Sequence, residues 1–254
     1  MERTLRQAPL VRLHQMQTRV AKRLPRIVTV SESSHDDIHH DHEVPRENMH
    51  VVPVGVDPDL FKPLPGITRT PGQLLTTASA DVTLKGLRYL LEAAAKLRTE
   101  RDVRLVIIGK PKTGGVSEET INRLGLGDIV EWVSGVPDQR IVELYSESEL
   151  AVVPSLYEGF SLPAIEAMSS AIPLVATSGG ALPEVVGNDG ETALVVPPGD
   201  SEALAAKIAW ALDHPELAQE IGRAGRQRVI DNWSWRHTAL ATVEQYRALL
   251  AETA

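Results

Sequence analysis

The stretch "PSLYEGFSLPAIEAM", residues 154–168, holds two glutamates, Glu158 and Glu166, eight positions apart around a Gly-Phe-Ser-Leu-Pro bend. On one continuous helix this spacing leaves the carboxylates on about the same face but two turns apart, too far to grip one small group. Pro163 suits the first turn of a helix, because its missing N–H costs no hydrogen bond there. We therefore expect Glu158 in a loop and Glu166 inside a helix, both facing one elongated ligand.

The bend between the two glutamates supplies backbone groups that suit an anion. Unpaired N–H groups and the helix dipole favour a phosphate at a helix N-terminus. The amides expected there belong to Gly159, Phe160, Ser161 and Leu162. A loop carboxylate, phosphate-binding amides and a helix carboxylate suit a nucleotide-sugar. Glu158 would accept hydrogen bonds from sugar hydroxyls, and Glu166 from the ribose diol.

The elements that must position these residues follow a repeated βαβ pattern. Short apolar runs alternate with stretches whose apolar residues recur at spacings of three and four, and the runs are "QLLTTAS", "RLVIIG", "IVEWVSG", "LAVVPS", "IPLVAT" and "TALVVPP". Nearly solid apolar runs are typical of strands covered on both faces of a parallel sheet. We predict an α/β fold with a Rossmann-like doubly wound parallel sheet of about six strands. Ligands of such sheets bind beyond the carboxyl ends of the strands, where strand order reverses.

Three segments carry a family resemblance, in order and at matching spacing: "PSLYEGFSLPAIEAM", "PLVATSGGALPEVVG" and "GETALVVPPGDSEALA". Over roughly residues 26–250 the chain resembles the retaining glycosyltransferases of the GT-B fold, in the group called family 4. Members have two Rossmann-like domains with the active site in the cleft between them, and the first domain holds the acceptor. The resemblance implies that this chain is the C-terminal, donor-binding half. A natural truncation, a split enzyme or an engineered fragment would each explain the missing domain.

The resemblance also implies roles for single residues. Glu158 and Glu166 match the family's E-x7-E pair, and Lys85 in "ADVTLKGL" matches a lysine that contacts the donor diphosphate. The family's base-binding loops correspond to Gly109, Lys110 and Pro111, and to Gly135, Val136 and Pro137. Many members carry an arginine about five residues before the lysine, and this chain has Ala80 near that position. Charge compensation would then rest on Lys85, the amides near Phe160, and Lys110 or Lys112.

The implied reaction is transfer of a sugar from a nucleoside diphosphate to an acceptor hydroxyl with retention of the anomeric configuration. Lys85 and the helix-terminus amides would stabilise the leaving diphosphate as its charge develops. Glu158 would position the sugar and could stabilise positive charge at the anomeric carbon. No metal or other cofactor is expected, and the acceptor, the sugar and the nucleotide stay open. Without the first domain, we expect donor binding but no efficient transfer.

Other functions are weaker fits to the sequence. A non-catalytic sugar-nucleotide-binding or assembly module that needs a partner chain is the main alternative, and an epimerase of the same fold is another. The loop "GKPKTGG" has Gly115 where the phosphate-loop pattern demands lysine, which argues against nucleotide hydrolysis. His35 and His39 lie one helical turn apart and could bind zinc, but a polar, solvated helix is the favoured interpretation.

Composition narrows the class of protein. The 254 residues are 43% apolar, enough for a buried core, and the absence of cysteine excludes disulfides, thiolate catalysis and cysteine-ligated zinc. Neither a signal peptide nor a long apolar run is found, so we expect a cytoplasmic location. The net charge is −8, yet residues 1–26 carry seven Arg or Lys against one Glu, so the remainder sums to −14. We expect no nucleic-acid partner.

The two ends of the chain differ from the middle. We predict a remnant of the acceptor domain in residues 1–55, a linker in 56–72, the nucleotide-sugar-binding domain in 73–232 and a C-terminal crossover helix in 233–254. The strand "RIVTVS" has no obvious sheet of its own. Unpaired strand edges and uncovered apolar faces seek partners, so we predict a homodimer through this remnant. The basic start, residues 1–24, could lie on the inner membrane surface, although packing on a preceding domain is favoured.

Overall fold

The computed structural model describes residues 13–78 and 81–252 of the chain. They form two compact units, one of residues 54–237 and one of the described parts of residues 1–53 and 238–254. Two features singled out in the sequence lie outside the described residues. These are Ala80, near the position of the family's arginine, and residues 1–12 of the basic start.

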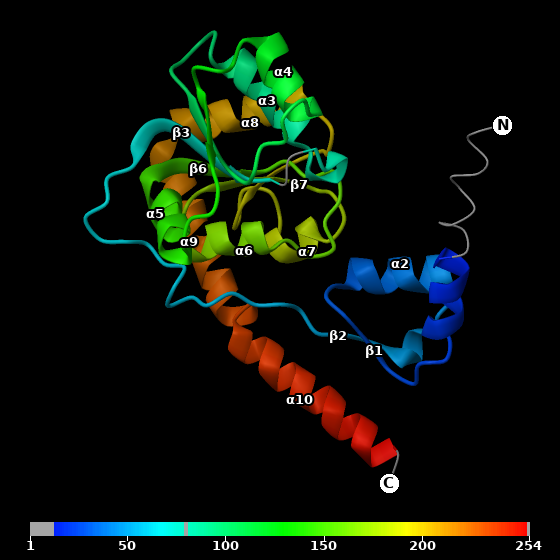
Figure 1. The fold of residues 1–254 in the computed structure, drawn as a ribbon. Coiled ribbons are helices and arrows are strands. Elements are labelled where there is room, and N and C mark those ends of the chain that lie inside the picture. Colours follow the sequence, from blue (N-terminus) through cyan, green and yellow to red (C-terminus); the bar gives the residue numbers. More distant parts are fainter. Residues whose placement is uncertain (1–12, 79–80, 253–254) are drawn as a thin grey trace, which may run out of the picture. The chain divides into compact units, whose positions relative to one another are not determined.

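The larger unit contains a parallel sheet of six strands, which confirms the predicted fold class (Figure 1). The strands lie in the order β5-β4-β3-β6-β7-β8, so the order reverses between β3 and β6. Their bounds are β3 Thr70–Thr77, β4 Arg104–Ile108, β5 Val130–Val133, β6 Ser148–Val153, β7 Leu174–Thr177 and β8 Leu194–Val196. The crevice beyond the carboxyl ends of β3 and β6 is therefore the expected ligand position.

Helices cover both faces of this sheet (Figure 1). One layer contains α3 (Leu87–Leu97), α4 (Val116–Leu124) and α8 (Ser201–Asp213), and the other contains α5 (Asp138–Glu147), α6 (Leu162–Ser169), α7 (Leu182–Val186) and α9 (Pro215–Asn232). Core leucines and isoleucines fill the space between helices and strands and are fully buried, among them Leu74, Leu90, Leu105 and Ile208. The solid apolar strands predicted from the sequence thus have a layer of helices on each side.

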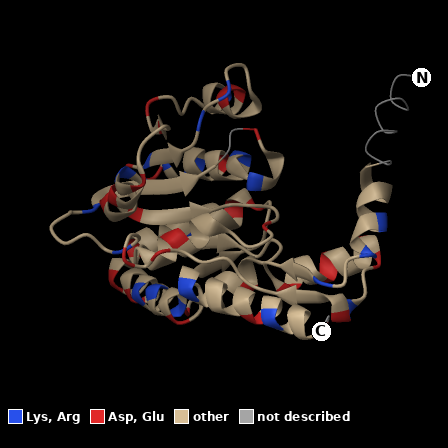
Figure 2. Ribbon diagram, turned by 60° about the horizontal axis from the view of Figure 1, so that its bottom comes forward, with Lys and Arg blue, Asp and Glu red and all other residues tan. Residues whose placement is uncertain are grey.

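Charged residues lie mainly on helices and loops, and the strands are almost free of them (Figure 2). Within the six strands the charged residues are Arg104, Glu131 and Glu149. Arg104 and Glu131 form an ion pair across neighbouring strands β4 and β5. The sheet therefore contributes little charge of its own, and the charges available to a ligand must come from the loops.

The smaller unit contains a short parallel sheet. It is made of β1 (Ile27–Thr29) and β2 (Met49–Val51), with α2 (Glu32–His42) and the 3-10 turn η1 (Arg46–Asn48) between them. The sequence prediction of a strand without a sheet was wrong, because β1 pairs with β2 along three residues. A strand of three residues after a 3-10 turn has no periodicity to detect, and the pairing joins residues about twenty positions apart.

Helix α2 carries the histidines considered as zinc ligands. His39 Nδ1 lies 2.8 Å from the carbonyl oxygen of Val44, and His35 Nδ1 lies 3.3 Å from Asp36 Oδ1. These contacts tie the rings to neighbouring backbone and side-chain oxygens. Within residues 13–78 and 81–252, no group of three or more potential ligands is arranged to hold a metal ion. Nor is any helix of this described part long and apolar enough to cross a bilayer.

The segment predicted as a linker packs along the larger unit. Val56 forms a parallel bridge with Ser234, just before α10 (Trp235–Glu252) begins. Phe61 is buried, and its carbonyl oxygen accepts a hydrogen bond of 3.0 Å from Arg226 of α9. These contacts fix the path of the chain into β3.

Candidate functional site

The loops that follow β3 and β6 meet where the strand order reverses. The amide of Leu156 donates to the carbonyl oxygen of Leu84 at 2.7 Å, so the two loops share a backbone hydrogen bond. Gly86 has a φ of +64°, and a Cβ there would lie 1.8 Å from the carbonyl oxygen of Pro154. Only glycine satisfies both the left-handed backbone and this close approach. The 3-10 turn η2 (Thr83–Lys85) is thereby held against the loop after β6.

This junction brings two predicted site residues into direct contact. Lys85 Nζ lies 2.8 Å from Glu158 Oε1 and 3.0 Å from Oε2, and the hydroxyl of Ser155 donates to Oε1 at 2.7 Å. The Glu158 side chain is 9% exposed, whereas that of Lys85 is 31% exposed. A carboxylate this deeply buried needs a counter-charge and hydrogen-bond donors, and it has both. The Lys85 side chain remains partly accessible to solvent.

The loop after β7 fixes the backbone of Glu158. The amide of Ala181 donates to the carbonyl oxygen of Glu158 at 2.8 Å, and Gly180 forms a bridge with Glu158. Gly180 has a φ of +61°, and a Cβ on it would lie 2.3 Å from that same carbonyl oxygen. The Gly-Gly pair at 179–180 therefore allows close packing against the Glu158 loop.

Glu166 lies in α6 and has its own partner. The hydroxyl of Tyr145, on α5, lies 3.2 Å from Glu166 Oε2 and donates to it. Burial raises the pKa of Glu166, the hydrogen bond from Tyr145 lowers it, and the nearby charge of Asp138 raises it. Burial also raises the pKa of Tyr145 well above its usual value, which keeps this hydroxyl protonated as a donor. Glu158 thus lies in the loop before α6 and Glu166 within α6, as expected from the bend.

The bend itself is anchored at the start of α6. Ser161 is the N-cap residue, with a φ of 98° that is unusual for a residue other than glycine. Its hydroxyl oxygen is buried and makes no hydrogen bond within the described part of the chain. The ring of Phe160 is buried and meets Trp233 edge to face, with 5.4 Å between the ring centroids. A buried hydroxyl without a partner at a helix N-terminus suits an anionic ligand.

The other predicted residues lie at the same edge of the sheet. Gly109, Lys110 and Pro111 follow β4, and Val136 precedes α5 after β5. Because all six strands are parallel, these loops and those of Lys85 and Glu158 share the carboxyl edge. A Cβ on Gly109 would lie 2.0 Å from the carbonyl oxygen of Ala78, which accounts for the glycine. Lys110 and Pro111 are exposed, and among the described residues no hydrogen bond joins them to Glu158 or Glu166.

Sequence reasoning missed several residues of this site. Ser155, which donates to Glu158, stands three positions earlier at the strand end, and a hydroxyl so close to a strand-end carboxylate could have been noticed. Gly180 could have been noticed as a glycine that a close backbone approach requires. Tyr145 gives no such signal, because it reads as one apolar position on an amphipathic helix 21 residues from Glu166.

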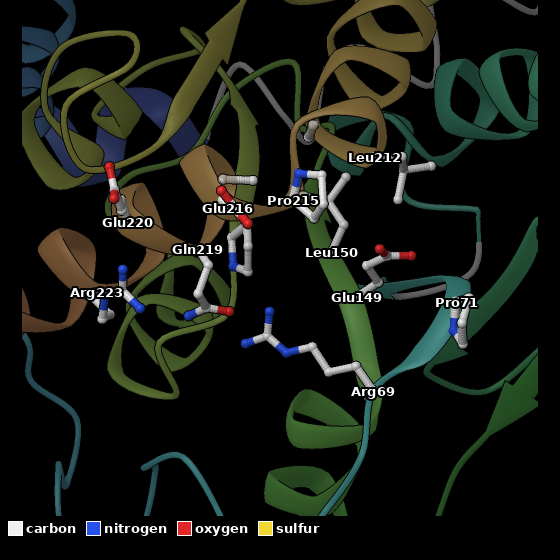
Figure 3. Close-up of a pocket in the computed structure, with 13 residues that line it drawn as sticks. Arg69, Pro71, Glu149, Leu150, Leu212, Pro215, Glu216, Gln219, Glu220 and Arg223 are labelled. Carbon is white, nitrogen blue, oxygen red and sulfur yellow. The ribbon is translucent and has the colours of Figure 1, made fainter.

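A separate cavity of about 540 Å³ opens at the opposite edge, beside the amino ends of β3, β6 and β7 (Figure 3). Arg69 reaches into it toward Gln219 and donates to the carbonyl oxygen of Ala171 at 3.1 Å, as does Gln219 at 3.0 Å. Burial lowers the pKa of Arg69. Both side chains hold the carbonyl group of Ala171, shortly before β7 begins. The cavity lies at the amino edge of the sheet and is therefore distinct from the site formed by the loops after β3 and β6.

Comparison with known proteins assigns this chain to a family. The family described as "Glycosyl transferases group 1" matches residues 68–228, more than half of the chain. The MMP alpha-(1->4)-mannosyltransferase of Mycolicibacterium hassiacum is 46% identical over 250 residues, covering 97% of this chain and 60% of that protein. The chain thus spans about three fifths of the length of this relative.

Solved structures agree with this assignment. Sucrose-phosphate synthase of Thermosynechococcus elongatus superposes with a TM-score of 0.83 at 26% identity, over 94% of this chain and 62% of that one. A protein of Anabaena, solved in complex with UDP and glucose, has the same fold at 21% identity, with a TM-score of 0.83 over 92% of this chain and 66% of that one. The chain described here belongs to the group 1 glycosyltransferases, and its larger unit is the Rossmann-like domain of their GT-B-type fold.

Proposed function

We propose that this chain binds a nucleoside-diphosphate sugar at the carboxyl edge of its six-stranded sheet and is the donor domain of a retaining, family 4 glycosyltransferase. The observation that carries the proposal is the contact between Lys85 and Glu158 where the strand order reverses. A cation for the diphosphate and a carboxylate for the sugar lie within 3 Å of each other there. Membership of a glycosyltransferase family and the 46% identical mannosyltransferase support the same assignment.

Lys85 and Glu158 divide the chemistry between them. The exposed side of the Lys85 ammonium binds the diphosphate and stabilises the negative charge that develops as the sugar leaves. Glu158 accepts hydrogen bonds from sugar hydroxyls and orients the ring, and its charge lies near the anomeric carbon. Ser155 and Lys85 hold its carboxylate in place before the donor arrives. No metal is assigned a role in this scheme.

The remaining contacts follow the shape of the donor. The N-terminus of α6, with Gly159, Phe160, Ser161 and Leu162, lies against the diphosphate. The Ser161 hydroxyl, which has no hydrogen-bond partner among the described residues, supports this placement. Glu166 accepts from the ribose diol. The loops with Gly109, Lys110 and Pro111 and with Val136 bind the base. A UDP-sugar is the first candidate donor, because a protein of the same fold was solved with UDP and glucose.

The smaller unit is proposed to be a remnant of the acceptor domain. A parallel pair of three-residue strands is not expected to be stable alone, since parallel sheets normally have more strands and helices on both faces. Further strands would come from a preceding domain or a partner chain. Residues 1–55, the linker 56–72, the donor domain 73–232 and the final helix 233–254 keep the boundaries predicted above. A cytoplasmic location, with contact between residues 1–24 and the inner membrane surface as an alternative to domain packing, belongs to the same proposal.

Calorimetry tests donor binding. The full chain is titrated with UDP-, GDP- and ADP-sugars, and at least one should bind with a dissociation constant below millimolar. Glu166→Ala should weaken that binding tenfold or more, since each charge-assisted bond contributes about 1.5–3 kcal/mol. Glu100→Ala is the matched control, because this exposed glutamate lies just before β4 at the opposite edge of the sheet. No binding by any of the three donors would refute the proposal.

A transfer assay then separates a donor-binding chain from a complete enzyme. With radiolabelled donor and cell-extract acceptors, we expect binding without efficient transfer. Robust turnover by the 254-residue chain would contradict the proposed remnant. Binding with no transfer, even after a partner chain is supplied, would favour a non-catalytic sugar-nucleotide module.

A further inference from the structure

We propose that Tyr145 is a positioning residue, which orients the carboxylate of Glu166 toward the ribose diol and so sets the preference for ribonucleotides over 2′-deoxyribonucleotides. The inference rests on the proposed function, since it assumes that Glu166 reads the ribose. The observation that carries it is the hydrogen bond from the Tyr145 hydroxyl to Glu166 Oε2, at 3.2 Å between α5 and α6.

Tyr145 is held in a single place. The residue is 2% exposed, and its ring meets Phe61 edge to face, with centroids 6.2 Å apart. The hydroxyl oxygen lies 3.4 Å from the carbonyl oxygen of Pro163, in the first turn of α6, as well as 3.2 Å from Glu166. A ring packed on all sides therefore fixes its hydroxyl relative to the start of the helix that carries Glu166.

A fixed donor gives the carboxylate one orientation. Glutamate has three rotatable side-chain bonds, and a partly exposed glutamate samples several rotamers unless something holds it. Each carboxylate oxygen can accept two hydrogen bonds, so one bond from Tyr145 to Oε2 leaves positions on both oxygens for two ribose hydroxyls. Orienting the carboxylate before the ligand arrives reduces the entropy lost on binding. The gain in affinity is largest for a ligand that donates hydrogen bonds to both carboxylate oxygens of Glu166.

Protonation gives a second measure of the same contact. Burial and Asp138 raise the pKa of Glu166, and the hydrogen bond from Tyr145 lowers it. Tyr145 and Asp138 both belong to α5. The charged groups on the other helices packed against α6 are Glu184 on α7 and Glu216, Glu220, Arg223, Arg226, Arg228 and Asp231 on α9. Removing the hydroxyl leaves only causes that raise the pKa. Glu166 then becomes a protonated, poorer acceptor at a higher pH.

The experiment measures affinity in the full chain with Tyr145→Phe, which removes only the hydroxyl. The nucleoside diphosphate that wild type binds best among UDP, GDP and ADP is compared with its 2′-deoxy form, from about pH 5 to 8. Ser146→Ala is the matched control, because this hydroxyl on the next residue of α5 is buried and has no hydrogen bond within the described residues.

We expect Tyr145→Phe to weaken binding of the ribonucleotide about tenfold, the effect of losing one hydrogen bond to a charged group. It should reduce the ratio between ribo- and 2′-deoxyribonucleotide affinities, and the acidic limb of the affinity profile should move to higher pH. Ser146→Ala should change none of these. If Tyr145→Phe keeps the wild-type ratio and profile, the positioning role is refuted while donor binding stands. If wild type binds no nucleotide, the proposed function itself fails.

Discussion

Under the proposed function, the ion pair between Lys85 and Glu158 links stability to ligand binding. Removing the cation by Lys85→Met leaves a carboxylate that is 9% exposed without its counter-charge. We expect the free energy of unfolding to fall by about 1–3 kcal/mol, less than for a fully buried pair because Lys85 reaches solvent. Adding Glu158→Gln should recover most of that loss without restoring donor binding. Urea denaturation and calorimetry on the same samples measure both quantities.

A surface ion pair serves as the control for this experiment. Lys207 and Asp189 are 2.8 Å apart, and Asp189 is 49% exposed. Lys207→Met should lower the free energy of unfolding by less than about 1 kcal/mol. If Lys85→Met lowers the free energy of unfolding no more than Lys207→Met does, the ion pair between Lys85 and Glu158 does not stabilise the fold as proposed.

Glu166 should show a trade-off between stability and binding. Because burial raises its folded-state pKa, the unfolded chain releases this proton at a lower pH than the folded chain does. The folded state therefore loses stability as pH rises from the unfolded pKa through the raised one. Glu166→Gln keeps an oxygen that accepts from Tyr145 but carries no charge. This variant should be more stable than wild type at neutral pH, yet bind donor more weakly.

Urea midpoints of wild type and Glu166→Gln, measured between about pH 4 and 8, check the sign of this pH dependence of stability. The advantage of Glu166→Gln should vanish toward the acidic end, where wild type is protonated in both states. Glu100→Gln, at an exposed position, should show no such trend. An advantage that grows toward low pH would contradict the assigned cause.

Among the secondary-structure elements, η2 and the start of α3 depend on a single glycine. Gly86→Ala would place a methyl group 1.8 Å from the carbonyl oxygen of Pro154 and would also strain a φ of +64°. Gly125 has nearly the same φ, +65°, but no atom of the described residues lies within 4 Å of a Cβ there. We expect Gly125→Ala to cost about 1 kcal/mol of stability and Gly86→Ala clearly more, since backbone must move as well. Thermal denaturation of both variants separates the cost of the backbone conformation from the cost of the clash. Equal losses of stability would mean that the contact with Pro154 adjusts without a measurable cost.

The elements themselves were predictable, whereas several pairings between them were not. Solid apolar runs identified all six strands of the sheet. Periodicity reports burial along a segment and says nothing about partners. For that reason β2, the contact between Ser155 and Glu158 and the hydrogen bond from Tyr145 to Glu166 escaped detection, and Lys85 was predicted to meet a phosphate, not a carboxylate. Family roles carried over by motif remain predictions.

For the whole molecule, the exposed apolar residues of the smaller unit predict self-association. Residues 13–21 are helical, and Leu13, Met16, Val20 and Leu24 are each between 43% and 51% exposed. Exposed apolar residues grouped in this way favour contact with another protein surface. Light scattering should show a dimer, and Met16→Ser with Val20→Ser should shift it toward monomer. Leu217→Ser, an equally exposed leucine on α9, is the control, and a monodisperse wild-type monomer would contradict the prediction.

The proposed function assigns the donor to one edge of the six-stranded sheet only, and chemical footprinting can test this difference between the edges. The sequence has no cysteine, so an introduced thiol would be the only thiol available to a cysteine-selective reagent. Leu162→Cys would place that thiol at the first turn of α6, where the side chain is 43% exposed and a helix N-terminus favours the reactive thiolate. Glu100→Cys would place it beyond the amino ends of the strands. Donor in solution should slow the reaction of iodoacetamide with the thiol at position 162 and leave the reaction at position 100 unchanged. The rule that ligands bind at the carboxyl edge of a parallel sheet then becomes a measurable difference between two reaction rates.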